Sequence, residues 1–237
     1  MNSPRFLPLS LSLLPILALA IPAFVKADDD LPEGAKLLVE DPLDESTFKP
    51  FWVKAKGKFA IEDGIFTARE IPEEKHHAGA GRIQPIMDGI LDVEFRFVES
   101  EQLQFGFDYT TDEKKDHLLR AVIDKGTVSA RAGSGWGPTT KMKPFGPKPV
   151  KVEVPAGEWH QGRIEFRGQE VIISVNGETY FAAAAETPLA GVEKNRIALT
   201  ARGVAQFRNL KLWSLEGVSD ADWGKRFRKA QRAAGGS

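Results

Sequence analysis

The chain has 237 residues, and its 32 Lys and Arg nearly balance its 33 Asp and Glu, for a formal net charge of −1. This balance lacks the positive surplus typical of nucleic-acid binding, so we expect no nucleic-acid partner. The sequence contains no cysteine, which excludes disulfides, Cys-ligated zinc and a thiol nucleophile. A domain of this length buries enough surface to fold without disulfides.

The N-terminal segment has the features of a signal peptide. Arg5 supplies positive charge, residues 7–24 are apolar, and residues 25–27 (Val-Lys-Ala) place small or apolar residues at the −3 and −1 positions of a cleavage site. Pro15 and Pro22 interrupt the apolar run, which favours a cleaved signal over a membrane anchor. We therefore predict cleavage after residue 27, a secreted or periplasmic protein, and no stable membrane insertion of the mature chain.

Short strands joined by tight turns follow. A first strand is predicted at residues 37–39. A hairpin is predicted from residues 58–61 and 65–68, because Asp63-Gly64 between them is a typical pair for a two-residue turn. Residues 73–81 lack periodicity and predict a loop that leads into a short strand at residues 82–86.

The clearest alternation lies in residues 91–97 and 103–109. Leu91, Val93, Phe95 and Phe97 face one way, and the first of these stretches places Asp, Glu and Arg on the other side. Such a period of two predicts strands with one face on a core and the other in water or a cleft.

The second half of the chain repeats this organisation. A hairpin is predicted from residues 117–123 and 127–132, followed by a long surface loop at residues 133–149. A three-stranded meander over residues 159–181 includes an Asn-Gly turn at 176–177. Residues 196–201 and 204–212 predict a final hairpin, and residues 219–233 a basic helix with a capping box at its start.

This pattern predicts an all-β fold, an antiparallel two-sheet jelly-roll sandwich. Residues 36–215 would form the sandwich, and residues 216–237 the short basic C-terminal helix and tail.

Polar residues on the non-core side of the central strands are the main candidates for a site. We expect them on adjacent strands of one sheet: Asp92, Glu94, Arg96, Gln104, Asp108 and Arg120. Carboxylates beside arginine give directional bonds to sugar hydroxyls. His117, at a strand entrance near Asp108, could act as a general base. The alternative is a solvated, salt-bridged outer face.

Two further features could contact a ligand. His76 and His77 lie together in a predicted loop, and Trp136, in the long loop, could stack on a sugar ring. A divalent metal site is an alternative, which would need His76 or His77 together with His117 and a carboxylate such as Asp108.

Several motifs resemble a known family. In order they are Asp63-Gly64-Ile65, residues 94–97 (Glu-Phe-Arg-Phe), residues 158–160 (Glu-Trp-His), Asn176-Gly177 and residues 207–210 (Phe-Arg-Asn-Leu). Together they resemble the 3-keto-disaccharide hydrolases, also described as 3-keto-glucoside lyase/hydratase domains and abundant in exported planctomycete proteins. The resemblance covers about residues 37–215. It implies a concanavalin A-like jelly roll that cleaves or binds sugars.

The chain also departs from that family. Where members often carry a Gly-Asn-Ser-Gly strand, residues 103–108 read Leu-Gln-Phe-Gly-Phe-Asp, and the next strand begins His117-Leu118-Leu119-Arg120. The hypotheses are therefore three: cleavage of a 3-keto-glycoside, with His117 and Asp108 as catalytic residues; carbohydrate binding without catalysis; and a protein-interaction module.

Overall fold

The computed structural model describes residues 30–110, 115–133, 141–187 and 189–235. The predicted signal segment lies outside these ranges, so cleavage and export stay predictions. No helix in the described ranges is long and apolar enough to cross a membrane.

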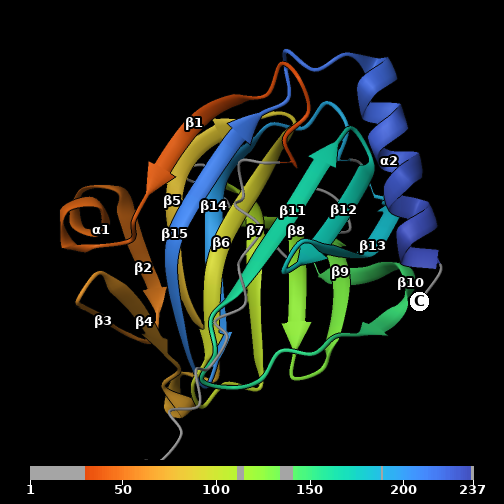
Figure 1. Cartoon of the computed structure of the whole chain (residues 1–237). Helices are drawn as coiled ribbons and strands as arrows, with labels where there is room; N and C mark the ends of the chain where they lie inside the picture. The colour runs from red at the N-terminus through yellow and green to blue at the C-terminus, as the bar shows by residue number, and fades with distance from the viewer. Residues whose placement is uncertain (1–29, 111–114, 134–140, 188, 236–237) are drawn as a thin grey trace, which may run out of the picture.

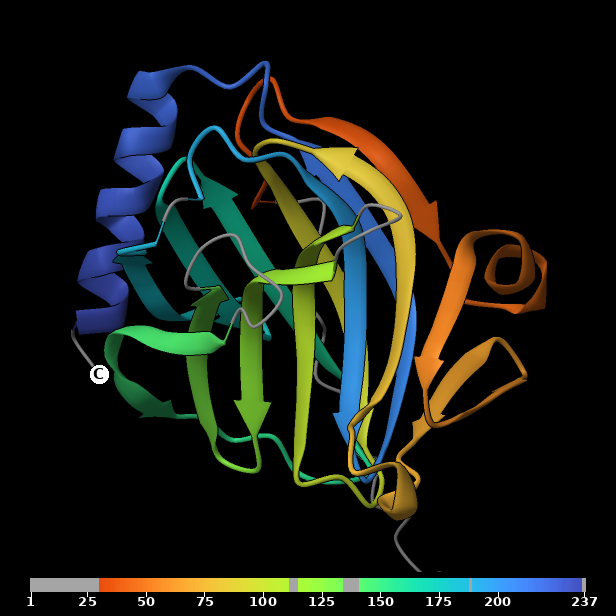
Figure 2. The same ribbon diagram turned by 180° about the vertical axis from the view of Figure 1, so that it is seen from behind.

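Two antiparallel sheets make up the described part of the chain (Figures 1 and 2). Sheet A runs in the order β13 (Glu178–Ala184), β12 (Glu170–Val175), β11 (His160–Arg167), β6 (Gly89–Phe97), β15 (Val204–Ser214), β4 (Ile65–Arg69) and β3 (Lys58–Glu62), with β1 (Lys36–Asp41) also paired to β15. Sheet B runs in the order β10 (Met142–Lys151), β9 (Thr127–Gly133), β8 (Lys115–Asp124), β7 (Gln102–Thr110), β14 (Lys194–Arg202), β5 (Ala78–Ile86) and β2 (Trp52–Lys56). The predicted two-sheet jelly-roll sandwich is confirmed.

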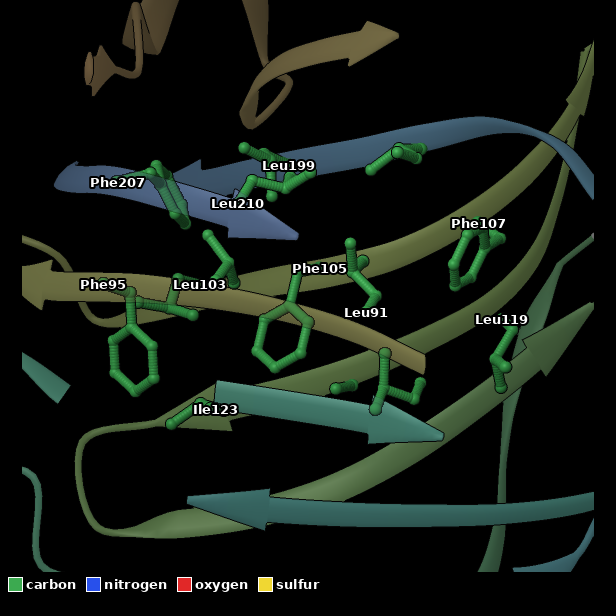
Figure 3. Packing of buried hydrophobic residues seen from close by; sticks show 14 of the residues in the cluster. Leu91, Phe95, Leu103, Phe105, Phe107, Leu119, Ile123, Leu199, Phe207 and Leu210 are labelled. Atoms are coloured by element: carbon green, nitrogen blue, oxygen red, sulfur yellow. The ribbon is translucent and has the colours of Figure 1, made fainter. Parts of the chain in front are cut away.

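Alternation places the core between the sheets, as the sequence predicts. Phe95 and Phe97 of β6 and Phe105 and Phe107 of β7 are fully buried. Figure 3 shows Phe95, Phe105 and Phe107 among inward side chains of neighbouring strands, including Leu199 of β14. Every second residue of each strand is therefore left to the outer face of its sheet.

The tight turns of the predicted hairpin and meander form as expected. Asp63 and Gly64 have φ of 52° and 71°, and Asn176 and Gly177 have φ of 52° and 82°. Two successive positive φ values make the type I′ geometry that matches the twist of paired strands. The hairpin of β3 with β4 and the meander of β11, β12 and β13 are confirmed.

Two predicted connections are wrong. The strands ending at Phe97 and beginning at Gln102 belong to different sheets, and so do β14 and β15 on either side of Gly203. The Arg202-Gly203 turn therefore carries the chain from one sheet to the other and closes no hairpin. The alternation of apolar residues shows which side of a strand is buried. Strands of both sheets bury one side in the same core, so the alternation is the same whether two successive strands pair in one sheet or lie in different sheets.

Other differences are local. Strand β5 begins at Ala78, inside the predicted loop, and β10 occupies much of the segment predicted as a long loop. The sequence analysis missed helix α1 (Glu45–Phe51), which Asp44 caps by accepting from the backbone N–H of Ser46 and Thr47. A short 3₁₀ turn, η2 (Pro72–Glu74), precedes the two histidines.

The predicted C-terminal helix is present as α2 (Asp220–Gly235) and packs along β12 and β13 on the outer side of sheet A (Figure 1). Ser219 caps it by accepting from the backbone N–H of Asp222. Trp223, Phe227 and Ala230 are buried in a second cluster with sheet A residues such as Ile172. The helix thus covers part of one outer face, while sheet B lies on the opposite side of the molecule (Figure 2).

Candidate active site

The residues predicted to share one sheet are divided between two. Asp92, Glu94 and Arg96 lie on β6 in sheet A, whereas the other predicted residues, Gln104, Asp108 and Arg120, lie on β7 and β8 in sheet B. The two groups face away from each other across the core. The expectation of one shared site is wrong because the chain changes sheet between β6 and β7.

The polar side chains of the sheet A group bind neighbouring side chains. Glu94 accepts from Arg208 Nε at 2.6 Å, and Arg96 donates through Nε to Gln206 at 2.7 Å. Asp92 is buried and pairs with Arg163 at 2.7 Å. These contacts match the salt-bridged outer face that the sequence left as the alternative.

The outer face of sheet B has a floor of very small residues. Gly81 of β5, Ala198 of β14 and Gly106 of β7 stand directly opposite one another across three adjacent strands. Gly106 has φ of 155°, and a Cβ there would collide with the carbonyl of Leu119. Next in the same row come Arg120 of β8 and Arg131 of β9. The centre of this row therefore carries no side chain larger than a methyl group, although all three residues are buried, and two arginines stand at one end of the row.

Asp108, His117 and Arg120 come together beside this floor. Asp108 opposes His117 in the register of β7 with β8, and a bulge after Phe107 brings Arg120 to the same carboxylate. The distance from His117 Nδ1 to Asp108 Oδ1 is 2.9 Å, and Arg120 Nη2 donates to the same oxygen. Arg120 also donates through Nη1 to the carbonyl of Phe107 at 2.6 Å.

Burial differs sharply within this group. Asp108 is 7% exposed and Arg120 is 2% exposed, whereas the His117 side chain is 51% exposed. Burial acts to raise the pKa of Asp108, but Arg120 and the hydrogen bond from His117 outweigh it and hold that pKa below its usual value. Asp108 is thus a fixed carboxylate. It orients the imidazole through Nδ1, which leaves Nε2 of an exposed ring for a ligand proton.

The remaining predicted residues are more scattered. Gln104 donates to the side chain of Gln102 at 2.7 Å. His76 is exposed, and its Nδ1 lies 2.7 Å from the carbonyl oxygen of His77. Trp136 lies outside the described residues.

His77 shares the outer face of sheet B, since it precedes Gly79 and Gly81 in the alternation of β5. Burial is the main cause that lowers its pKa, and the charges of His76, Arg202 and Arg131 add to this. The described ranges hold no group of three or more His, Asp and Glu side chains placed to bind a metal ion. The zinc alternative of His76 or His77 with His117 and Asp108 is therefore not assembled there.

Two polar residues of β14 on this face were missed by the sequence analysis. Arg196 opposes Asp108 in the register and is 6% exposed, and Thr200 lies four residues further along the strand. The buried atoms Arg196 Nε and Thr200 Oγ1 have no hydrogen-bond partner in the ranges that the structure describes. The sequence carried a usable signal, since Arg196, Ala198 and Thr200 alternate with the apolar residues Ile197, Leu199 and Ala201.

The fold and the face just described define a concanavalin A-like jelly-roll domain. The profile of the 3-keto-alpha-glucoside-1,2-lyase-like domain matches residues 40–212. The chain belongs to this family, which confirms the resemblance seen in its motifs. No curated protein sequence matches the chain.

Solved structures with the same fold have very different sequences. Carbohydrate-binding module CBM66 from Bacillus subtilis has a TM-score of 0.55 at 11% identity, over 69% of this chain and 95% of that one. A GlcNAc-α-1,4-Gal-releasing endo-β-galactosidase from Clostridium perfringens has a TM-score of 0.57 at 12% identity, over 80% and 65%. Porphyranase B from Zobellia galactanivorans has a TM-score of 0.56 at 10% identity, over 81% and 98%. At such identities the likeness establishes the fold alone.

Proposed function

We propose that this protein cleaves 3-keto-glycosides on the outer face of sheet B, with His117 as the general base. The observation that carries the proposal is the contact of an exposed imidazole, through Nδ1, with the buried carboxylate of Asp108 at 2.9 Å. Membership of the 3-keto-alpha-glucoside-1,2-lyase-like family supports the substrate class. The structural likeness to a carbohydrate-binding module and to glycan-cleaving enzymes is consistent with it.

A ketone at C3 makes the hydrogen on C2 acidic, and elimination begins with its removal. His117 Nε2 takes this proton, and the electron pair left on C2 becomes the C1–C2 double bond as the bond from C1 to the glycosidic oxygen breaks. The leaving oxygen takes up a proton from water and departs as an alcohol, and His117 then releases the proton from C2 to solvent. The products are an unsaturated keto sugar and the released alcohol, and later addition of water to the double bond would make the net reaction a hydrolysis.

Asp108 and Arg120 are positioning residues in this scheme. An imidazole must present a neutral Nε2 to act as a base, and a carboxylate bound at Nδ1 selects that tautomer. Arg120 donates to the same carboxylate oxygen as His117 and is itself anchored by two backbone carbonyls, those of Phe107 and Leu119. A base held in one orientation near its substrate avoids much of the entropic cost of reaction.

The test is turnover of 3-keto-trehalose, followed by mass spectrometry of the released sugar, in buffer with and without an added divalent cation. We expect turnover by the wild type and a loss of about 100-fold or more in His117→Gln, the usual size of a general-base contribution. His76→Gln is the matched control, because His76 is an exposed histidine outside the group. Absence of wild-type turnover would refute the proposal. Substrate binding without turnover would instead favour the non-catalytic carbohydrate-binding alternative.

A further inference from the structure

Arg196 is a buried cation with no acidic partner among the described residues. The residue is 6% exposed, and within the described part of the chain its Nε has no hydrogen-bond partner and its Nη2 has a long contact of 3.4 Å to the carbonyl of Val53. Arginine stays charged in proteins, and buried charges are almost always paired, because an unpaired one loses its hydration without compensation. The structure therefore presents a guanidinium whose counter-ion comes from outside the described residues.

Asp108 does not fill this role. It stands opposite Arg196 in the register, but its carboxylate already bonds Arg120 and His117. The Arg196 side chain runs over Gly81, on the far side of β14 from Asp108, and a Cβ at Gly81 would collide with Nε. Asp108 acts on Arg196 through its charge, and the effect is too weak to offset burial, which lowers the pKa of Arg196.

A second unsatisfied group lies on the same strand. Thr200 Oγ1 is buried without a hydrogen-bond partner, and Ala198 separates Thr200 from Arg196 along the outer side of β14. Gly79 and Gly81 on the adjacent strand carry no side chains that could supply partners. The guanidinium of Arg196 and the hydroxyl of Thr200 thus lie on one side of the same strand with only the methyl group of Ala198 between them, an arrangement that suits a sugar with an acidic group and hydroxyls.

Other charged residues on the outer face of sheet B also favour an anionic ligand. Arg131 lies in the row that contains Gly106 and Arg120, is exposed, and makes no ion pair with a described residue. Its charge and that of Arg202 act on His77 against the opposite effect of Glu70, and Arg202 is itself paired with Glu101. Asp108 balances Arg120, which leaves the positive charges of Arg196 and Arg131 in surplus.

We infer that Arg196 and Thr200 form a subsite for an acidic sugar, with the guanidinium binding a carboxylate or sulfate and the threonine hydroxyl binding a ring hydroxyl. This inference depends on the proposal that the outer face of sheet B takes carbohydrate. It narrows the substrate class to glycosides with an anionic substituent, and it places that substituent on the β5 side of β14, away from His117.

Calorimetric titration at low ionic strength tests the subsite with cellobiose, its uronic acid form and a sulfated cellobiose. We expect the wild type to bind an acidic disaccharide roughly tenfold or more tightly than cellobiose, since a charge-assisted bond contributes at least that much. Arg196→Gln should remove the preference and Arg196→Lys should retain part of it. The two acidic probes distinguish carboxylate from sulfate. Equal affinity for all three sugars, or no binding of either acidic probe, would overturn the inference.

Thr200→Val provides a variant of nearly the same shape. It should weaken binding of acidic and neutral sugars alike, because it removes a hydroxyl contact and leaves the charge. A preference for acidic sugars that persists in Arg196→Gln would also overturn the subsite. The probes carry no ketone, so failure of 3-keto-trehalose cleavage leaves this result standing. Cleavage of 3-keto-trehalose together with equal affinity for acidic and neutral disaccharides would contradict the subsite and leave the proposed cleavage in place.

Discussion

Asp108 combines burial with a fixed charge, and this makes it important for stability as well as for the site. Its carboxylate joins a buried guanidinium on β8 to the exposed ring of His117. Removing one partner of a buried ion pair leaves the other charge uncompensated, which commonly costs about 3–5 kcal/mol. Replacing His117 should cost less stability, because half of its side chain is exposed.

We predict that Asp108→Asn lowers the free energy of unfolding by about 3–5 kcal/mol at neutral pH, because Arg120 loses its counter-charge. The folded-state pKa of Asp108 is depressed, so its contribution is present above the unfolded-state pKa of about 4 and is lost as the pH falls through the folded-state value. Urea unfolding at several pH values measures both effects. The variant should therefore differ less from the wild type at strongly acidic pH.

His117→Gln is the control for this prediction. A glutamine on the exposed side of the pair leaves the contact of Asp108 with Arg120 in place, so the unfolding free energy should change by no more than about 0.5 kcal/mol. A loss in His117→Gln as large as that in Asp108→Asn would show that the imidazole supports the fold and would weaken its assignment as a base.

The contacts of individual residues could be predicted from the sequence only where a local pattern indicated them. The pairing of His117 with Asp108 follows from adjacent alternating strands. The burial of Arg196 and Lys194 could not be predicted in this way, because charged residues are expected in solvent unless their partners are known. The Nζ of Lys194 donates to three backbone carbonyls. The carbonyl of Met87 comes from a distant segment, and although those of Val192 and Leu189 are close in the chain, no side-chain pattern in the sequence marks them as partners.

At the scale of elements, strands and tight turns were predictable, while the assignment of strands to sheets was not. Asn176-Gly177 and Asp63-Gly64 define their turns by local backbone preference. Gly203 looks the same in the sequence, yet its neighbours belong to different sheets. The difference lies in what surrounds the glycine. A Cβ at Gly203 would collide with the carbonyl of Glu99, whereas nothing lies within 4 Å of one at Gly64.

These two glycines give a matched pair of substitutions. Both have positive φ, 89° for Gly203 and 71° for Gly64, so alanine is strained at either position by about 1–2 kcal/mol. Gly203→Ala adds a backbone collision at the crossing between the sheets. We predict that it destabilises the protein by at least about 2 kcal/mol more than Gly64→Ala, as measured by thermal or urea unfolding. Similar losses for both variants would mean that the crossing relaxes freely.

The whole molecule depends on one core that both sheets share. Phe105 of β7 is fully buried, and its ring lies against Gly162 of β11, where a Cβ would approach Phe105 Cζ to 2.7 Å. Sheet A thus leaves space at Gly162 for a ring from sheet B. Neither sheet can keep its inner face out of water alone, so we expect the sandwich to unfold as one cooperative unit.

Phe105→Ala tests this expectation, because it opens a cavity between the sheets without touching the polar outer faces. We predict a loss of about 3–5 kcal/mol, the usual cost of truncating a buried phenylalanine. Phe105→Leu fills part of the space and should lose less. Unfolding is followed by far-ultraviolet circular dichroism for the strands and by tryptophan fluorescence, to which Trp213 beneath α2 contributes. Coincident transitions in both variants would establish a single unit, whereas fluorescence and dichroism transitions that separate would mean that part of the sandwich unfolds on its own.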